Sequence, residues 1–115
     1  MRKPYFNREF TIYTDASGLA IGAVLAQSDE TGEYAVYYAS RLLKGAEIHY
    51  TITEKECLAI VWAIKYFRVY VYGTTFTVVT DHAALKWLLN LTNPEGRLAR
   101  WAVSVQSFSF KIVDQ

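Results

Sequence analysis

Apolar and polar residues in the first third of the chain follow the patterns of short strands. Residues 9–15 alternate with a period of two, residues 20–27 are small and apolar, and residues 34–40 are rich in β-branched and aromatic side chains. Turn-forming sequences occupy residues 16–18 and 29–32 between them. This part of the chain therefore predicts an antiparallel meander of three strands.

A helical spacing of apolar residues replaces the strand pattern after residue 50. It runs over residues 51–71, where apolar side chains surround much of the helix circumference. Two overlapping capping boxes mark its start, one formed by Thr51 and Glu54 and the other by Thr53 and Glu56. We expect this helix to be buried against a sheet.

The last part of the chain mixes both patterns. A strand is predicted over residues 74–80, a short helix over residues 83–90, a second helix opening at Asn93-Pro94, and a strand over residues 107–113. Because helices precede both strands, these strands are expected to pair in parallel. The predicted fold is α/β, with a five-stranded mixed sheet of a three-stranded antiparallel meander plus two parallel strands and helices packed on it.

Composition and charge exclude several classes of protein. The 115 residues are 52% hydrophobic and 20% charged, which is typical of one folded globular domain. The single cysteine, Cys57, excludes an intrachain disulfide and favours a reducing compartment. No apolar run reaches the roughly 18 residues of a membrane span, and the N-terminus lacks the apolar segment of a signal peptide. The net charge of +1 indicates no preference for nucleic acids or membranes.

Three acidic residues differ from ordinary surface charges by their positions. Asp15 ends the first strand, Asp81 ends the fourth, and Glu56 lies in the first turns of the long helix. Carboxyl ends of strands beside helix starts often build sites, so the three carboxylates are candidates for one site that holds a hard divalent cation such as Mg²⁺. Each also has a local explanation: a helix N-cap for Asp81, a capping-box partner for Glu56 and an Asx turn for Asp15.

Five segments of the chain carry a more specific pattern. They are residues 10–17 (FTIYTDAS), 22–27 (GAVLAQ), 38–43 (YASRLL), 53–63 (TEKECLAIVWA) and 80–82 (TDH). In this order they resemble the ribonuclease H domain of gypsy-type LTR retrotransposon and retrovirus-like reverse transcriptase polyproteins. The resemblance implies the ribonuclease-H-like fold and an endoribonuclease that hydrolyses the RNA strand of RNA–DNA hybrids during reverse transcription.

The resemblance also implies roles for the acids. Asp15, Glu56 and Asp81 match the family's catalytic carboxylates, which hold two Mg²⁺ (or Mn²⁺) ions, whereas Glu54 is expected to cap the helix or support the site from outside. In the implied mechanism, a metal-activated water attacks the RNA phosphate and the second ion stabilises the departing 3′ oxygen.

Substrate contacts and partners follow from the same resemblance. Ala16, Ser17, Thr53 and His82 are expected to line the RNA strand, although His82 has the alternative of making only local hydrogen bonds at a helix start. The implied partners are an RNA–DNA hybrid and the polymerase domain of the parent polyprotein. No membrane is implied, and the expected location is intracellular, in the cytoplasm or a virus-like particle.

The resemblance bears on domain organisation as well. Residues 1–115 are expected to form a single ribonuclease-H-like domain, with residues 1–8 as an N-terminal extension. The family pattern continues into a further helix with a fourth acid, so the domain is expected to be C-terminally truncated, and Asp114 does not take that acid's role. The alternative function is a noncatalytic ribonuclease-H-like tether or a domesticated interaction domain.

Other chemically distinctive residues have structural explanations. Cys57 is expected to be a half-buried structural cysteine, since no base is placed to activate it. Trp62, Trp87 and Trp101 lie on helical patterns and are expected in the core. Lys86, Arg97 and Arg100 either contact phosphates of a bound hybrid or belong to a solvated helix face.

Overall fold

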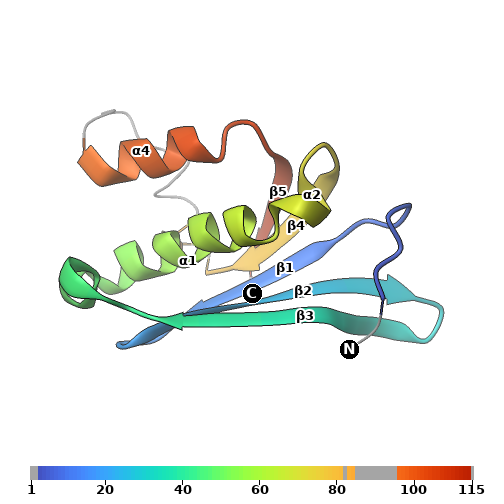
Figure 1. The fold of residues 1–115 in the computed structure, drawn as a ribbon, viewed down its shortest axis with the longest axis horizontal. Coiled ribbons are helices and arrows are strands. Elements are labelled where there is room, and N and C mark those ends of the chain that lie inside the picture. Colours follow the sequence, from blue (N-terminus) through green and yellow to red (C-terminus); the bar gives the residue numbers. More distant parts are fainter. Residues whose placement is uncertain (1–2, 82, 85–95, 115) are drawn as a thin grey trace.

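Five strands form one mixed sheet in the order β3-β2-β1-β4-β5 (Figure 1). The computed structural model describes residues 3–81, 83–84 and 96–114. The strands are β1 (Thr11–Ala16), β2 (Ala20–Asp29), β3 (Gly32–Leu42), β4 (Thr75–Thr80) and β5 (Ser109–Asp114). β1, β2 and β3 pair antiparallel, whereas β4 pairs in parallel with both β1 and β5. The predicted mixed sheet is therefore confirmed.

Helices lie over one face of this sheet (Figure 1). They are α1 (Ile52–Tyr66), α2 (Arg68–Val71) and α4 (Gly96–Ser104), preceded by the 3₁₀ turn η1 (Gly45–His49). α1 contacts β1, β2 and β4, and α4 packs against α1. Among the residues that the structure describes, no helix is both long enough and apolar enough to cross a membrane.

Two details of the helical region differ from the sequence prediction. The single helix expected over residues 51–71 is two helices, because Phe67 (φ −95°, ψ 15°) leaves the helical conformation between α1 and α2. The connection over residues 41–50 contains η1, which the pattern did not predict. The short helix predicted over residues 83–90 lies mostly outside the described residues, and so does the predicted opening of the second helix at Asn93-Pro94.

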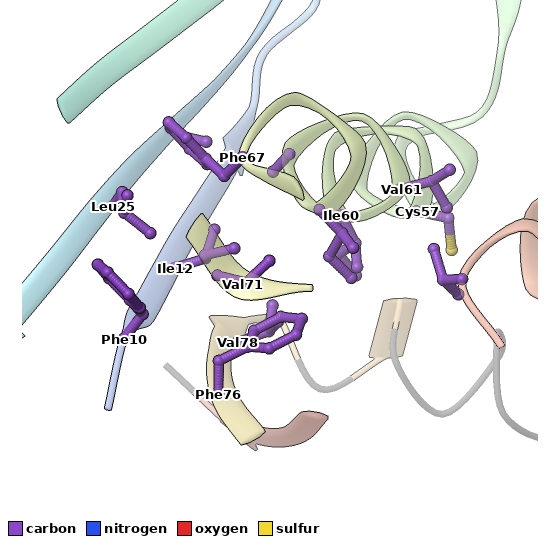
Figure 2. Packing of buried hydrophobic residues seen from close by; sticks show 14 of the residues in the cluster. Phe10, Ile12, Leu25, Cys57, Ile60, Val61, Phe67, Val71, Phe76 and Val78 are labelled. Carbon is purple, nitrogen blue, oxygen red and sulfur yellow. The ribbon is translucent and has the colours of Figure 1, made fainter. Parts of the chain in front are cut away.

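The core lies between α1 and the sheet. Phe10, Ile12 and Thr14 of the β1 region all face inward, as the alternation predicted. Figure 2 shows Phe10 and Ile12 beside Leu25, with α1 above them presenting Ile60. Burial of such side chains contributes about 1.5–3 kcal/mol each, so this contact is the main reason that α1 stays on the sheet.

A turn at residues 5–8 packs against the end of the sheet where β1 begins. Its backbone is held by the buried amide of Gln27, whose Oε1 accepts the Tyr5 N–H at 2.8 Å. The Nε2 of Gln27 donates to the carbonyls of Tyr5 at 2.7 Å and Arg8 at 3.1 Å. The Phe6 ring stacks on Tyr70 with 6.2 Å between centroids. Part of the expected N-terminal extension is thus fixed to the domain.

Candidate active site

The parallel pairing of β1 and β4 brings two of the predicted acids to the same edge of the sheet. Tyr13 and Val79 are register partners. Asp15 and Asp81 stand two residues further along, at the carboxyl ends of the two strands, and both side chains are exposed. The crossover through α1 therefore places these carboxylates side by side, although they are far apart in sequence.

The first turns of α1 supply the third acid. Of the two possible capping boxes, the one between Thr51 and Glu54 forms: Thr51 Oγ1 accepts the Glu54 N–H at 3.1 Å, and Glu54 Oε1 accepts the Thr51 N–H at 2.9 Å. Glu56 is therefore not a capping partner of Thr53. Its carboxylate is left to face the edge of the sheet.

All three carboxylates line one cavity of about 70 Å³. Thr14 and Thr80 also line it, from the inner face of β1 and β4. Desolvation raises the pKa of the Glu56 carboxyl above its ordinary value, and the negative charges of Asp81 and Asp15 raise it further. The structure thus brings the three predicted acids close enough to interact electrostatically.

Each aspartate also makes one local hydrogen bond. Asp15 Oδ1 accepts the Ala16 N–H at 3.0 Å, and Asp81 Oδ1 accepts the Ala83 N–H at 2.8 Å. The local explanations for Asp15 and Asp81 are therefore partly realised. Since no further hydrogen bond reaches either carboxylate from the described residues, the second oxygen of each stays available to a ligand.

The other predicted site residues have different placements. Ala16 lines the same cavity. Ser17 is exposed in the β1–β2 turn, where its Oγ accepts the N–H groups of Leu19 at 3.3 Å and Ala20 at 3.1 Å. Thr53 is half-buried in the first turn of α1 and does not line the cavity. His82 lies outside the described residues.

Two residues near the site escaped the sequence analysis. The Thr14 side chain is buried, and its Oγ1 has no hydrogen-bond partner among the described residues. Its inward orientation was visible in the alternation of β1, but its lack of a partner was not. Lys55 is also buried, and its Nζ donates to the Gly18 carbonyl at 3.0 Å. No sequence signal distinguishes Lys55 from an exposed helix lysine.

Cys57 behaves as a structural residue, as predicted. Its Sγ donates to the Ala84 carbonyl at 3.2 Å, which ties α1 to the segment that follows β4. Burial, reinforced by the charges of Glu56 and Glu54, raises the pKa of the thiol to about 12. The thiolate is the nucleophilic form of cysteine. Cys57 is therefore a neutral packing group at neutral pH.

Arg97 also serves the scaffold. Its Nη1 lies 3.1 Å from Glu54 Oε2, and its guanidinium stacks over the Tyr50 ring at 4.1 Å from the centroid. This links α4 to the capping box of α1. Arg100 is exposed. Arg97 thereby helps to hold the start of α1, the helix that carries Glu56.

The sheet order and the helices on one face define a ribonuclease-H-like fold, and solved structures with the same fold support this. LC11-RNase H1 has a TM-score of 0.64 at 16% identity, over 94% of this chain and 86% of that chain. Prototype foamy virus protease-reverse transcriptase has a TM-score of 0.78 at 13% identity, over 100% of this chain and 16% of that chain. At such identities, the likeness shows the fold alone.

Sequence comparison identifies the family. Residues 5–108 match the RNase H-like domain found in reverse transcriptase, and the chain belongs to this family. It is 44% identical over 112 residues to the retrovirus-related Pol polyprotein from transposon 297 of Drosophila melanogaster, covering 97% of this chain. It is 39% identical over 112 residues to the transposon Tf2-3 polyprotein of Schizosaccharomyces pombe, covering 93% of this chain. The chain spans only 10% and 8% of these two polyproteins.

Proposed function

We propose that this chain is a ribonuclease H that hydrolyses the RNA strand of RNA–DNA hybrids within a reverse transcriptase polyprotein. The observation that carries the proposal is the cavity shared by Asp15, Glu56 and Asp81. Membership of the reverse transcriptase RNase H-like family supports it. So does the likeness in fold to LC11-RNase H1, whose structure is known in complex with an RNA/DNA hybrid.

The donor set suits hard divalent cations, because Mg²⁺ and Mn²⁺ prefer carboxylate oxygens. Asp15, Glu56 and Asp81 would hold two such ions, which when bound supply an activated water and stabilise the leaving 3′ oxygen. In the described part of the chain, no three Asp, Glu, His or Cys side chains are yet gathered closely enough to ligate one ion. We therefore expect the carboxylates to draw together when the ions bind.

The residues around the acids have supporting roles in this proposal. The local hydrogen bonds to Ala16 and Ala83 each fix one oxygen of Asp15 and Asp81. Ala16, at the end of β1, and Ser17, in the exposed β1–β2 turn, would face the RNA strand. The 2′-hydroxyl groups of that strand distinguish it from DNA.

Cleavage of a labelled RNA–DNA hybrid tests the proposal, with the chain in its parent polyprotein and with Mg²⁺ or Mn²⁺ present. Asp15→Asn and Asp81→Asn should each reduce cleavage by more than about 100-fold, because each removes a charged ligand. The matched control is Glu30→Gln, which removes an exposed acid in the β2–β3 turn and should leave cleavage unchanged. Full cleavage by either aspartate variant contradicts the site.

A second outcome concerns the alternative function. If the wild-type polyprotein binds the hybrid but does not cleave it with either ion, the chain is a noncatalytic ribonuclease-H-like tether. Binding is then measured separately, with a hybrid and with a DNA duplex of the same sequence.

A further inference from the structure

Lys55 differs from the other lysines that the structure describes. Lys55 is buried, with a relative solvent exposure of only 8%. The other described lysines are all exposed: Lys3, Lys44, Lys65 and Lys111. An ammonium group is costly to bury unless it is hydrogen-bonded. The Nζ of Lys55 meets this need by donating to the Gly18 carbonyl at 3.0 Å.

The acceptor belongs to the tip of the β1–β2 turn. Within the turn, the Ser17 N–H donates to the Ala20 carbonyl at 2.8 Å, and the Leu19 carbonyl accepts the Leu43 N–H at 2.8 Å. These bonds join the turn to itself and to the end of β3. Among the described residues, Lys55 donates the hydrogen bond that joins the turn to α1.

Packing between the turn and α1 is incomplete. A cavity of about 290 Å³ separates them, lined by Ala16, Ser17, Gly18, Ile52 and Lys55. Beside the turn, Ile21 and Leu43 pack on Leu58 and Ala59 of α1, so packing holds the base of the turn. At the tip, where the cavity provides no van der Waals contacts, the turn is held to α1 by the Lys55 hydrogen bond.

The two segments that Lys55 joins also carry two of the carboxylates. Asp15 lies in β1 two residues before Ser17, the first residue of the turn, and Glu56 directly follows Lys55 in α1. Consecutive helix residues do not face the same direction. This is why Lys55 reaches the turn while Glu56 lines the cavity of the acids.

We propose that Lys55 is a positioning residue for hydrolysis of the RNA strand. Its ammonium holds the β1–β2 turn against α1 and thereby sets the spacing of Asp15 from Glu56 and the direction in which Ser17 faces the substrate. Lys55 does not contact the reacting atoms. This inference rests on the proposed function.

The first test measures how firmly the β1–β2 turn is held, by a readout that is independent of catalytic activity. Lys55→Met retains most of the aliphatic stem and removes the donor, and Lys65→Met is the matched control at an exposed position of α1. Amide hydrogen exchange at Leu43, which donates to the turn, should become about tenfold faster in Lys55→Met and stay unchanged in Lys65→Met. Unchanged exchange in Lys55→Met overturns the inference.

The second test separates positioning from substrate binding. In hybrid cleavage by the polyprotein, Lys55→Met should lower kcat about tenfold and change KM by less than about twofold, because misplaced carboxylates affect the chemical step. A raised KM with an unchanged kcat overturns the inference and makes Lys55 a phosphate contact. Unchanged kcat and KM also overturn it.

Two further arms keep the outcome decisive. If Lys55→Met does not fold, Lys55→Gln replaces it. The glutamine amide ends one bond short of the position of Nζ, so it is expected not to reach the Gly18 carbonyl. If the wild type cleaves the hybrid and the Lys55 variant cleaves it with the same kcat and KM, only the positioning role is rejected. An inactive wild type rejects the proposed function, and the positioning role with it.

Discussion

The two ends of β1 meet opposite requirements. At the amino end, Phe10 is 1% exposed and Ile12 is fully buried, and nearby polar groups such as the Gln27 amide are hydrogen-bonded. At the carboxyl end, the buried Thr14 hydroxyl has no partner among the described residues, and Asp15 faces two other acids across a small cavity. One end is arranged for stability. The other leaves polar groups unsatisfied where a ligand can use them.

This contrast is typical of proteins in which a site is maintained at the expense of stability. It predicts that substitutions at the amino end destabilise the fold, whereas selected substitutions at the carboxyl end stabilise it and impair function.

The largest effect is expected at the packed end. Phe10→Ala should lower the free energy of unfolding by about 3–5 kcal/mol, because it leaves a cavity between α1 and the sheet. Phe6→Ala is the control, since Phe6 is 65% exposed and its loss should cost less than about 1 kcal/mol. Urea denaturation measures both. Equal losses would contradict the placement of the core.

The next effect concerns the buried amide that holds residues 5–8. Gln27→Leu should lower the free energy of unfolding by about 1–3 kcal/mol, because the backbone groups of Tyr5 and Arg8 lose their partners. Gln106 is exposed after α4, so Gln106→Leu should change stability little. If both variants are equally stable, the turn at residues 5–8 is not held by Gln27.

A smaller effect of opposite sign is expected at Thr14. Thr14→Val should raise the free energy of unfolding by about 1 kcal/mol, because it removes a buried hydroxyl that lacks a partner. The matched control is Thr77→Val on β4, where Oγ1 donates to Glu9 Oε1 at 3.0 Å and the substitution should destabilise. If Thr14→Val destabilises by as much as Thr77→Val, the contrast between the two ends is wrong.

The last stability prediction depends on pH. The raised pKa of Glu56 means that the folded state disfavours its ionised form, so wild-type stability falls as the pH rises through the ordinary carboxyl range to the raised pKa. Glu56→Gln should therefore be more stable than wild type at pH 7 in a chelating buffer. The difference should disappear below the ordinary glutamate pKa, where both side chains are neutral. If Glu56→Gln remains more stable than wild type at acid pH, the stabilisation arises from altered packing and not from the loss of the charge.

Much of the fold was predictable because its determinants are local or topological. The alternation in residues 9–15 and 74–80 predicted the central strands and placed Asp15 and Asp81 at their ends, and the intervening helices predicted parallel pairing of the last two strands. The parallel pairing of β1 with β4, which brings the two aspartates together, is visible only in the structure. Phe67 shows the limit: the helical pattern continues through it, and the break between α1 and α2 is visible only in the structure.

The supporting residues of the site were not predictable because their roles depend on tertiary burial. The sequence offered Glu56 two explanations, and the capping-box explanation was excluded only when Thr51 proved to be the N-cap and Glu54 its partner. In the sequence, Lys55 cannot be distinguished from a solvent-exposed helix lysine. Its burial depends on the β1–β2 turn, which packs beside it in the folded structure. Its hydrogen bond spans 37 residues of sequence, beyond the reach of any local pattern.

Direct titration with Mn²⁺ tests whether the carboxyl ends of β1 and β4 form a divalent-cation site. Calorimetry on the wild type should show saturable binding, weakened more than about tenfold by Asp15→Asn and unchanged by Glu30→Gln. Equal Mn²⁺ affinity in wild type and Asp15→Asn would contradict the account.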